Sequence, residues 1–133
     1  MNIRPNLQFS VLCDDVRRED NGKFILIGLF EAITAKAFPA THPVLFVVNR
    51  WCKGQGSFQQ KIKIVSSKDK SIVFQTSDQP FELQDIDGHH TLISKVNNLV
   101  FTGPGKYWVE VLIDGNLILN YPLILKEVKD DPQ

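Results

Sequence analysis

Apolar and polar residues alternate along much of this chain with the two-residue period of a β-strand. In the segment 58–65, Ile62 and Ile64 fall on one face, while Lys61 and Lys63 fall on the other. Two further segments alternate in the same way, 7–13 and 107–113. Because successive strand residues point to opposite faces of a sheet, each segment predicts a strand with one face in a hydrophobic core.

Two other segments are apolar on both faces. Residues 24–30 are apolar at every position except Gly28, and residues 43–52 contain the run from Val44 to Val48. We expect Gly28 to mark a bulge or a close approach of the backbone. A strand that is apolar on both sides must be covered on both sides, so both segments predict central strands.

The connections near the start of the chain are shorter and more polar. Residues 14–23 predict a polar connection with a tight turn at Asp20-Asn21-Gly22. Residues 31–38 fit either a bent strand or one helical turn ending at Pro39, and we favour the strand.

The middle of the chain predicts one hairpin followed by irregular structure. Residues 72–74 return to pair with 58–65, and we expect that pairing to end at Asp78-Gln79-Pro80. Residues 81–98 show no sustained period, which predicts loops and short strands.

Asp114-Gly115-Asn116 is the strongest hairpin signal in the chain, and its loop length sets the register of the last strand. A two-residue loop would turn Leu117 and Leu119 outward and put Asn120 in the core, whereas a three-residue loop would bury both leucines. Burial therefore favours three residues. Pro122 lacks an amide donor, which predicts a sheet edge or a bulge at that point.

Composition supports an all-β fold. Val and Ile occur 12 times each and Phe 9 times, against 4 Ala and 1 Met, a balance that favours strands over helices. About eight strands separated by turn residues predict a two-sheet antiparallel β-sandwich, with a small β-barrel as the alternative. We expect a single domain over residues 1–126 and a polar C-terminal tail over 127–133.

Charge and length narrow the classes of partner. The 133 residues carry 15 basic and 15 acidic side chains, without the basic patch that nucleic-acid binding requires. No apolar run approaches the roughly 20 residues of a membrane-spanning helix, and no secretory signal precedes the first strand. These features predict a cytoplasmic protein that binds neither nucleic acid nor membranes.

The two cysteines, Cys13 and Cys52, each end a predicted strand and could face each other across the two sheets. In a cytoplasmic protein they are expected to stay reduced and to act as small buried hydrophobic residues. The chain has no Cys-x-x-Cys pair, so a zinc knuckle is excluded.

Residues 85–90 contain the one cluster with plausible metal ligands: Asp85, Asp87, His89 and His90. A calcium loop starting at Asp85 would need Gly where His90 stands. Adjacent histidines on a strand point to opposite faces, which disfavours a shared metal ion. We therefore predict a solvated turn, and no metal, cofactor or catalytic residue; an enzymatic role would depend on these four residues alone.

Two tryptophans are the best candidates for a binding surface. Trp108 lies on the face opposite Tyr107 and Val109, and Trp51 shares a face with Leu45 and Val47. If the other face of each strand fills the core, the tryptophan faces need a second cover. The rest of the chain could supply that cover, or else a partner subunit or a ligand.

Three segments carry a resemblance to a known family: LeuCysAspAsp, GlyLysPheIleLeuIleGlyLeuPhe and GlyLysTyrTrpValGluValLeuIleAspGly. Together they resemble a family of small bacterial β-sandwich proteins of unknown function, over most of the chain. The resemblance implies a compact cytoplasmic two-sheet domain and assigns no catalytic residue.

Two functional hypotheses follow from the residues. The first is a non-enzymatic protein-interaction or assembly module, a possible homo-oligomer, because the chain has more two-sided apolar strands than one core requires. The second is a domain that binds a small molecule or carbohydrate in a pocket enclosed by loops 53–57, 78–90 and 102–106.

Overall fold

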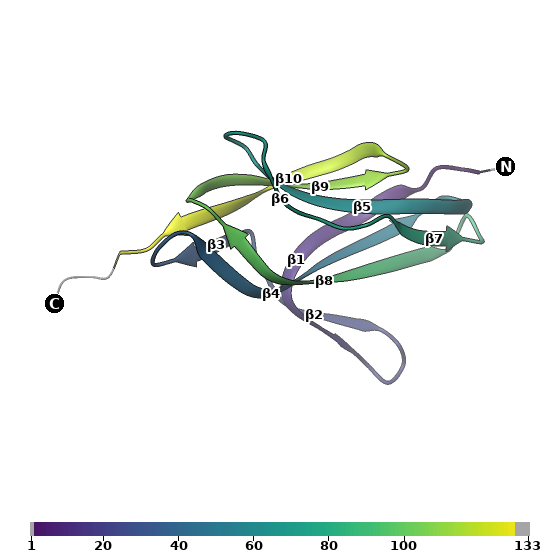
Figure 1. Cartoon of the computed structure of the whole chain (residues 1–133). Helices are drawn as coiled ribbons and strands as arrows, with labels where there is room; N and C mark the ends of the chain where they lie inside the picture. Colours follow the sequence, from purple (N-terminus) through teal and green to yellow (C-terminus); the bar gives the residue numbers. More distant parts are fainter. Residues whose placement is uncertain (1, 130–133) are drawn as a thin grey trace.

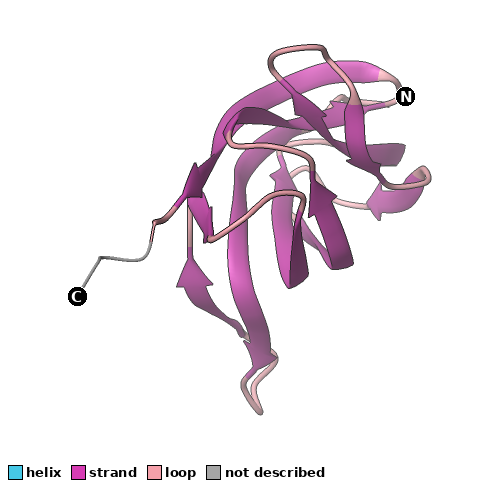
Figure 2. Ribbon diagram, turned by 60° about the vertical axis from the view of Figure 1, so that its left-hand side comes forward, coloured by secondary structure: helices cyan, strands magenta, loops and turns pink. Residues whose placement is uncertain are grey.

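A computed structural model describes residues 2–129 of the chain. The described residues form ten strands and no helix, so none of them belongs to a helix that could cross a membrane (Figures 1 and 2). The strands are β1 (Asn6–Arg18), β2 (Phe24–Leu29), β3 (Ala32–Ala35), β4 (Ala40–Cys52), β5 (Gly56–Ser66), β6 (Ile72–Gln75), β7 (Gln79–Leu83), β8 (His89–Phe101), β9 (Gly105–Ile113) and β10 (Asn116–Glu127).

The ten strands form two sheets, as the sequence predicted. One sheet has four strands in the order β2-β1-β4-β8, and the other has six, in which β3-β10-β9-β5-β6 form a path and β7 also pairs with β5. All pairs are antiparallel except β10 with β3. The two-sheet prediction is confirmed, with ten strands where about eight were expected.

The space between the sheets holds the hydrophobic core. Its larger part brings together Leu12, Leu45 and Val47 of the four-stranded sheet with Ile62 and Ile64 of the six-stranded sheet. The alternation in 58–65 is thereby confirmed, because Ile62 and Ile64 point inward whereas Lys61 and Lys63 point outward.

The hairpin of β1 and β2 corrects one prediction. Residues 14–18 belong to β1 and pair with β2, so only the tip around Gly22 is a connection. The hairpin projects from the body of the molecule (Figure 1). Gly28 has a φ of 73°, and a Cβ atom there would collide with the Asp14 side chain, which confirms the predicted close approach.

The middle of the chain contains more strand than its pattern predicted. Pairing continues past Asp78, since β7 carries Pro80 opposite Gln59 of β5. Most of 81–98 then belongs to β8, a strand of 13 residues paired along its length with β4. Periodicity missed β8 because it lies at a sheet edge, where polar residues occupy positions on both faces.

The hairpin of β9 and β10 has a shorter turn than predicted, but most of β10 pairs with β9 in the predicted register. Ile113 pairs with Asn116, so the loop has two residues, Asp114 and Gly115, both with positive φ. Leu117 is consequently 52% exposed. A bulge between Leu117 and Leu119 then restores the expected register, with Tyr121 opposite Val109.

The end of β10 is also longer than expected. Residues 124–127 of β10 pair with β3 on one side. Pro122 lies before this pairing begins and has only β9 as a neighbour among the described strands, which confirms a sheet edge at the proline. Val128 still donates its amide to the carbonyl of Ala35. The predicted polar tail therefore begins as paired structure, and its residues 130–133 lie outside the described part.

Candidate interaction surface

The four-stranded sheet is apolar on the face that points away from the core. Val47 of β4 is fully buried in the core, so its neighbours Phe46 and Val48 point to the opposite face. Strand register places Val11 of β1 and Ile93 of β8 beside Val48. We call this apolar surface the outer face; it consists of Phe9, Val11, Cys13, Ile25, Ile27, Leu29, Phe46, Val48 and Ile93.

Side chains of the outer face cover one another only in part. Val48 is 1% exposed and Cys13 is fully buried at the centre, whereas Phe9, Phe46 and Ile93 around them are half-buried. Every strand of the described chain lies in one of the two sheets, so residues 2–129 supply no third layer over this face (Figure 2).

Exposure is greatest on β2. Ile25, Ile27 and Leu29 are 42%, 44% and 60% exposed, although the sequence predicted that both faces of this segment would be covered. That prediction is wrong because β2 is the edge strand of its sheet and not a central one. Its outer edge has no strand beside it among the described residues, so an exposed apolar edge results, which is a common site of strand pairing between chains.

Charged groups lie on the same side of the sheet, because the register sets Asp15 opposite Ile27 and Arg17 opposite Ile25. Arg17 and Asp15 form an ion pair of 2.7 Å, and this partner holds the pKa of the Asp15 carboxyl below its usual value. Arg50 donates to Thr91 at 2.8 Å and places its guanidinium over the Phe9 ring. The apolar side chains therefore have charged side chains next to them on the same face, a mixture that is common at protein interfaces.

The two tryptophans predicted to form a binding surface differ in their exposure. Trp51 is fully buried, stacks on Phe81 and donates its indole N–H to Gln60 Oε1 at 2.7 Å. It is thus covered by its own chain and contributes nothing to an exposed surface. Trp108 is half-buried on the outward side of the six-stranded sheet, with the Lys106 Nζ 5.2 Å from its ring centroid.

A polar network surrounds Trp51 between the sheets. Gln60 Oε1 also accepts from Asn49 Nδ2, and Gln60 Nε2 donates to Gln79 Oε1, whose amide nitrogen donates to Ser94 Oγ. Asn49 and Gln60 are fully buried, yet Asn49 Oδ1 has no partner among the described residues. Gln60 occupies an inward position of an alternating strand, and this was the signal that could have revealed the network.

Neither the two cysteines nor the residues of the acidic loop, 85–90, form a binding site in the described part of the chain. Cys13 and Cys52 are free thiols near opposite ends of one paired β1–β4 ladder, so they do not face each other across the sheets. Burial raises the pKa of the Cys13 thiol. Within residues 2–129 no three His, Cys, Asp or Glu side chains lie close enough to hold a metal ion.

The residues of the acidic loop have local roles. Asp85 accepts the amide of Asp87 in the turn before β8. His90 packs its ring against Phe81, and His89 is exposed.

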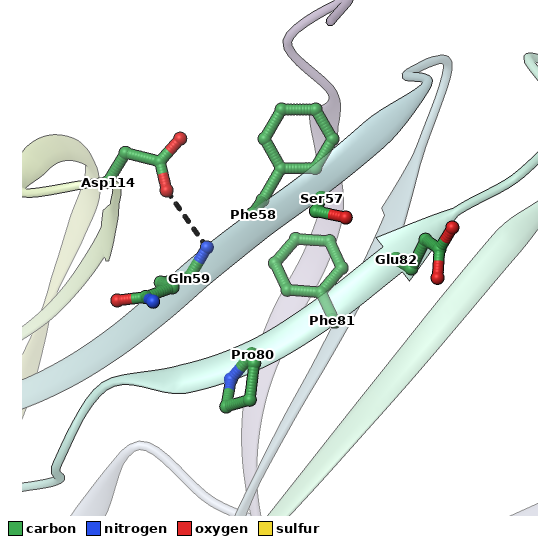
Figure 3. A pocket seen from close by; sticks show the side chains of 7 residues that line it. All are labelled: Ser57, Phe58, Gln59, Pro80, Phe81, Glu82 and Asp114. Carbon is green, nitrogen blue, oxygen red and sulfur yellow. Dashed lines mark hydrogen bonds between the residues drawn. The ribbon is translucent and has the colours of Figure 1, made fainter.

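A shallow cavity of about 410 Å³ lies at one end of the six-stranded sheet (Figure 3). Glu82 and Asp114 stand on either side of it, and Asp114 accepts the amide of Gln59 at 2.9 Å. Two of the three predicted loops contribute to it. Loop 102–106 lies at the other end of β5, because Gly56 pairs with Leu83 whereas Ser66 pairs with Tyr107, so the three loops do not enclose one pocket.

Fold and surface together define the class of this protein: an all-β two-sheet domain whose smaller sheet has an apolar face that residues 2–129 leave uncovered. The chain belongs to a family of unknown function (DUF6941), whose model matches residues 8–126. This match confirms the resemblance to a family of unknown function. No curated protein matches the sequence.

Proposed function

We propose that this protein is a non-enzymatic assembly module in which two copies pair through the open edge of β2. The observation that carries the proposal is the exposure of Ile25, Ile27 and Leu29 on an edge strand that has no outer neighbour in the described part of the chain. Paired copies would satisfy the free backbone groups of both edges and withdraw apolar area from water.

The edge is complementary to itself. In an antiparallel pair centred on Ile27, Ile25 would lie opposite Leu29 of the second copy, and Ile27 opposite its own equivalent. Each of these cross-strand pairs is apolar, and none sets like charges against each other. The chain has no net charge, so two copies approach without long-range repulsion.

Pairing would also enlarge the outer face. The two four-stranded sheets would join edge to edge, and the half-buried Phe46 and Ile93 of both copies would belong to one continuous surface. A six-residue edge is short for a stable dimer. We therefore expect reversible association that depends on the side chains of β2.

A cytoplasmic location and a bacterial origin are part of the same proposal. The support for the first is that both cysteines are free thiols, which fits a reducing compartment. The support for a bacterial origin is that three segments near the two ends of the chain resemble a family of small bacterial β-sandwich proteins.

Sedimentation equilibrium at micromolar concentrations tests the proposed pairing. We expect the wild-type protein to associate reversibly and Ile27→Lys to be monomeric, since the charge would lie at the centre of the pair. Ile86→Lys is the matched control, because Ile86 is exposed to a similar extent, 41%, but lies in a loop away from β2. A wild-type monomer at every concentration, or equal loss of association in both variants, would overturn the proposal.

A further inference from the structure

The outward side of the six-stranded sheet has a groove that the proposed pairing does not use. It has a volume of about 360 Å³ and lies where β5, β6 and β9 run side by side. Trp108, Val65 and Ile72 form its apolar wall, and Lys63, Lys70 and Glu110 are its charged residues. The groove combines a flat aromatic surface with cations.

Trp108 is available to a ligand. Its side chain is half-buried, between Val65 on β5 and Pro122 on β10, and its indole N–H makes no hydrogen bond within residues 2–129. The Lys106 Nζ lies over the ring, 5.2 Å from its centroid, so a lysine side chain faces the indole there. A planar group could replace the lysine stem there, since aromatic rings stack well on indole.

The cations of the groove have few partners of their own. Lys63 lies opposite Glu110 in the ladder, yet no ion pair joins them, and Lys70 makes none either within the described residues. Lys70 is held in place by its main chain, which donates to Ser66 at 2.9 Å and has a φ of 59°. Lys63 and Lys70 line the groove and Lys106 lies over Trp108, so three lysines stand against the one carboxylate of Glu110 among the residues that line or border the groove.

We propose that this groove binds a small anion that carries a planar ring, with the ring on Trp108 and the anionic group between Lys63 and Lys70. The apolar wall alone would accept a neutral ring, and the lysines alone would accept any small anion. Their combination favours a ligand with both parts, because charge-assisted hydrogen bonds then add to stacking.

NMR titration with three probes separates these contributions. The probes are 2-naphthoate, which has ring and charge, 2-naphthamide, which has the ring alone, and acetate, which has the charge alone. We expect naphthoate to shift the Trp108 indole N–H signal saturably and more strongly than either other probe. The Trp51 signal should not move, because that indole is buried and bonded to Gln60.

Variants show whether the named residues form the site. Trp108→Ala should abolish naphthoate binding, followed through the backbone amide signals of the groove because this variant lacks the indole reporter, and Lys63→Gln or Lys70→Gln should weaken binding about fivefold each. Lys61→Gln is the matched control: Lys61 lies two residues from Lys63 on the same face, but pairs with Asp78 at 3.7 Å and does not line the groove. Equal affinity for naphthamide, equal weakening by Lys61→Gln, or no saturable shift would overturn the proposal.

Discussion

Both sheets contribute apolar side chains to the core, but their outer faces differ. On β5 of the six-stranded sheet, inward Ile62 and Ile64 alternate with outward Lys61 and Lys63. On β4 of the four-stranded sheet, inward Val47 is flanked by outward Phe46 and Val48, which are also apolar. A strand that alternates needs one neighbouring layer, whereas a strand that is apolar throughout needs two. The smaller sheet therefore carries the surface that the described chain leaves uncovered.

The difference also concerns sheet edges. β2 ends the smaller sheet with three exposed aliphatic side chains and projects from the body of the protein. At β6 of the larger sheet, the exposed Ile72 has Lys70 beside it in the groove. A charged side chain near an edge hinders strand pairing, and β2 has no such charge between Phe24 and Leu29.

The largest expected effect is the difference in stability between replacing a tryptophan inside the core and replacing one on the outward side of a sheet. Trp51→Ala should lower the free energy of unfolding by about 3–5 kcal/mol, because it leaves a cavity between the sheets. Trp108→Ala, on the outward side, should cost about 1 kcal/mol. Urea denaturation of both variants measures the difference, and similar values would show that the outer layer matters as much as the core.

The next effect concerns the contacts that join the sheets. Gln60→Leu should cost about 2–4 kcal/mol, because Asn49 and Trp51 would each lose a buried hydrogen bond and Gln79 a partly buried one. Gln59→Leu changes the adjacent exposed side chain and should remain within about 0.5 kcal/mol of wild type. Urea denaturation compares them; a neutral Gln60→Leu would mean that an apolar contact replaces the network without loss.

A smaller effect is expected at the edge strand. Gly28→Ala should cost about 1–3 kcal/mol, because the residue has positive φ and a Cβ atom would collide with Asp14. Gly22→Ala also has positive φ but open space around it, so it should cost about 1 kcal/mol. Thermal unfolding ranks the two. Equal losses would show that the contact with Asp14 relaxes freely.

The smallest effect is a pH dependence at another link between the sheets. Tyr121 of the larger sheet and Ser10 of the smaller one share a hydrogen bond of 2.9 Å. Burial raises the pKa of Tyr121 to about 12, and the bond to Ser10 opposes that shift. Because this is above the ordinary value of 10.0, the stability that depends on the neutral phenol is intact below pH 10 and is lost as the pH rises through about 12.

Comparison with Tyr121→Phe isolates this contribution. Relative to the phenylalanine variant, the wild-type protein should become less stable between pH 10 and pH 12 and keep a constant difference below that range. Urea midpoints at several pH values measure it. A constant difference up to pH 12 would contradict the assignment.

Much of the fold could be predicted from local patterns. The alternation at Ile62 and Ile64 gave the facing of β5 correctly, and Pro122 marked a sheet edge. The Asp114-Gly115 turn was placed correctly but with the wrong length, because a bulge after Leu117 corrected the register that the turn had shifted. Alternation alone cannot predict a bulge. One extra residue in a strand switches the face of the sheet to which every later side chain of that strand points.

The candidate surface was predicted less well. An excess of apolar strand surface was evident, yet it was assigned to the faces of Trp51 and Trp108. Trp51 proved to be inside because Gln60 of β5 accepts its indole N–H and Phe81 of β7 stacks on its ring. The sequence pattern predicts cover for residues of β2 that are exposed, because a local pattern cannot distinguish a central strand from an edge strand.

By itself, the sequence determined that this chain forms strands, where most of them turn, and that their apolar residues exceed the needs of one core. These properties depend on side-chain period and turn chemistry, which act over a few residues. Only the tertiary structure decided which apolar face lacks cover. Strand order and register set that outcome, because they depend on pairings between residues far apart in the chain.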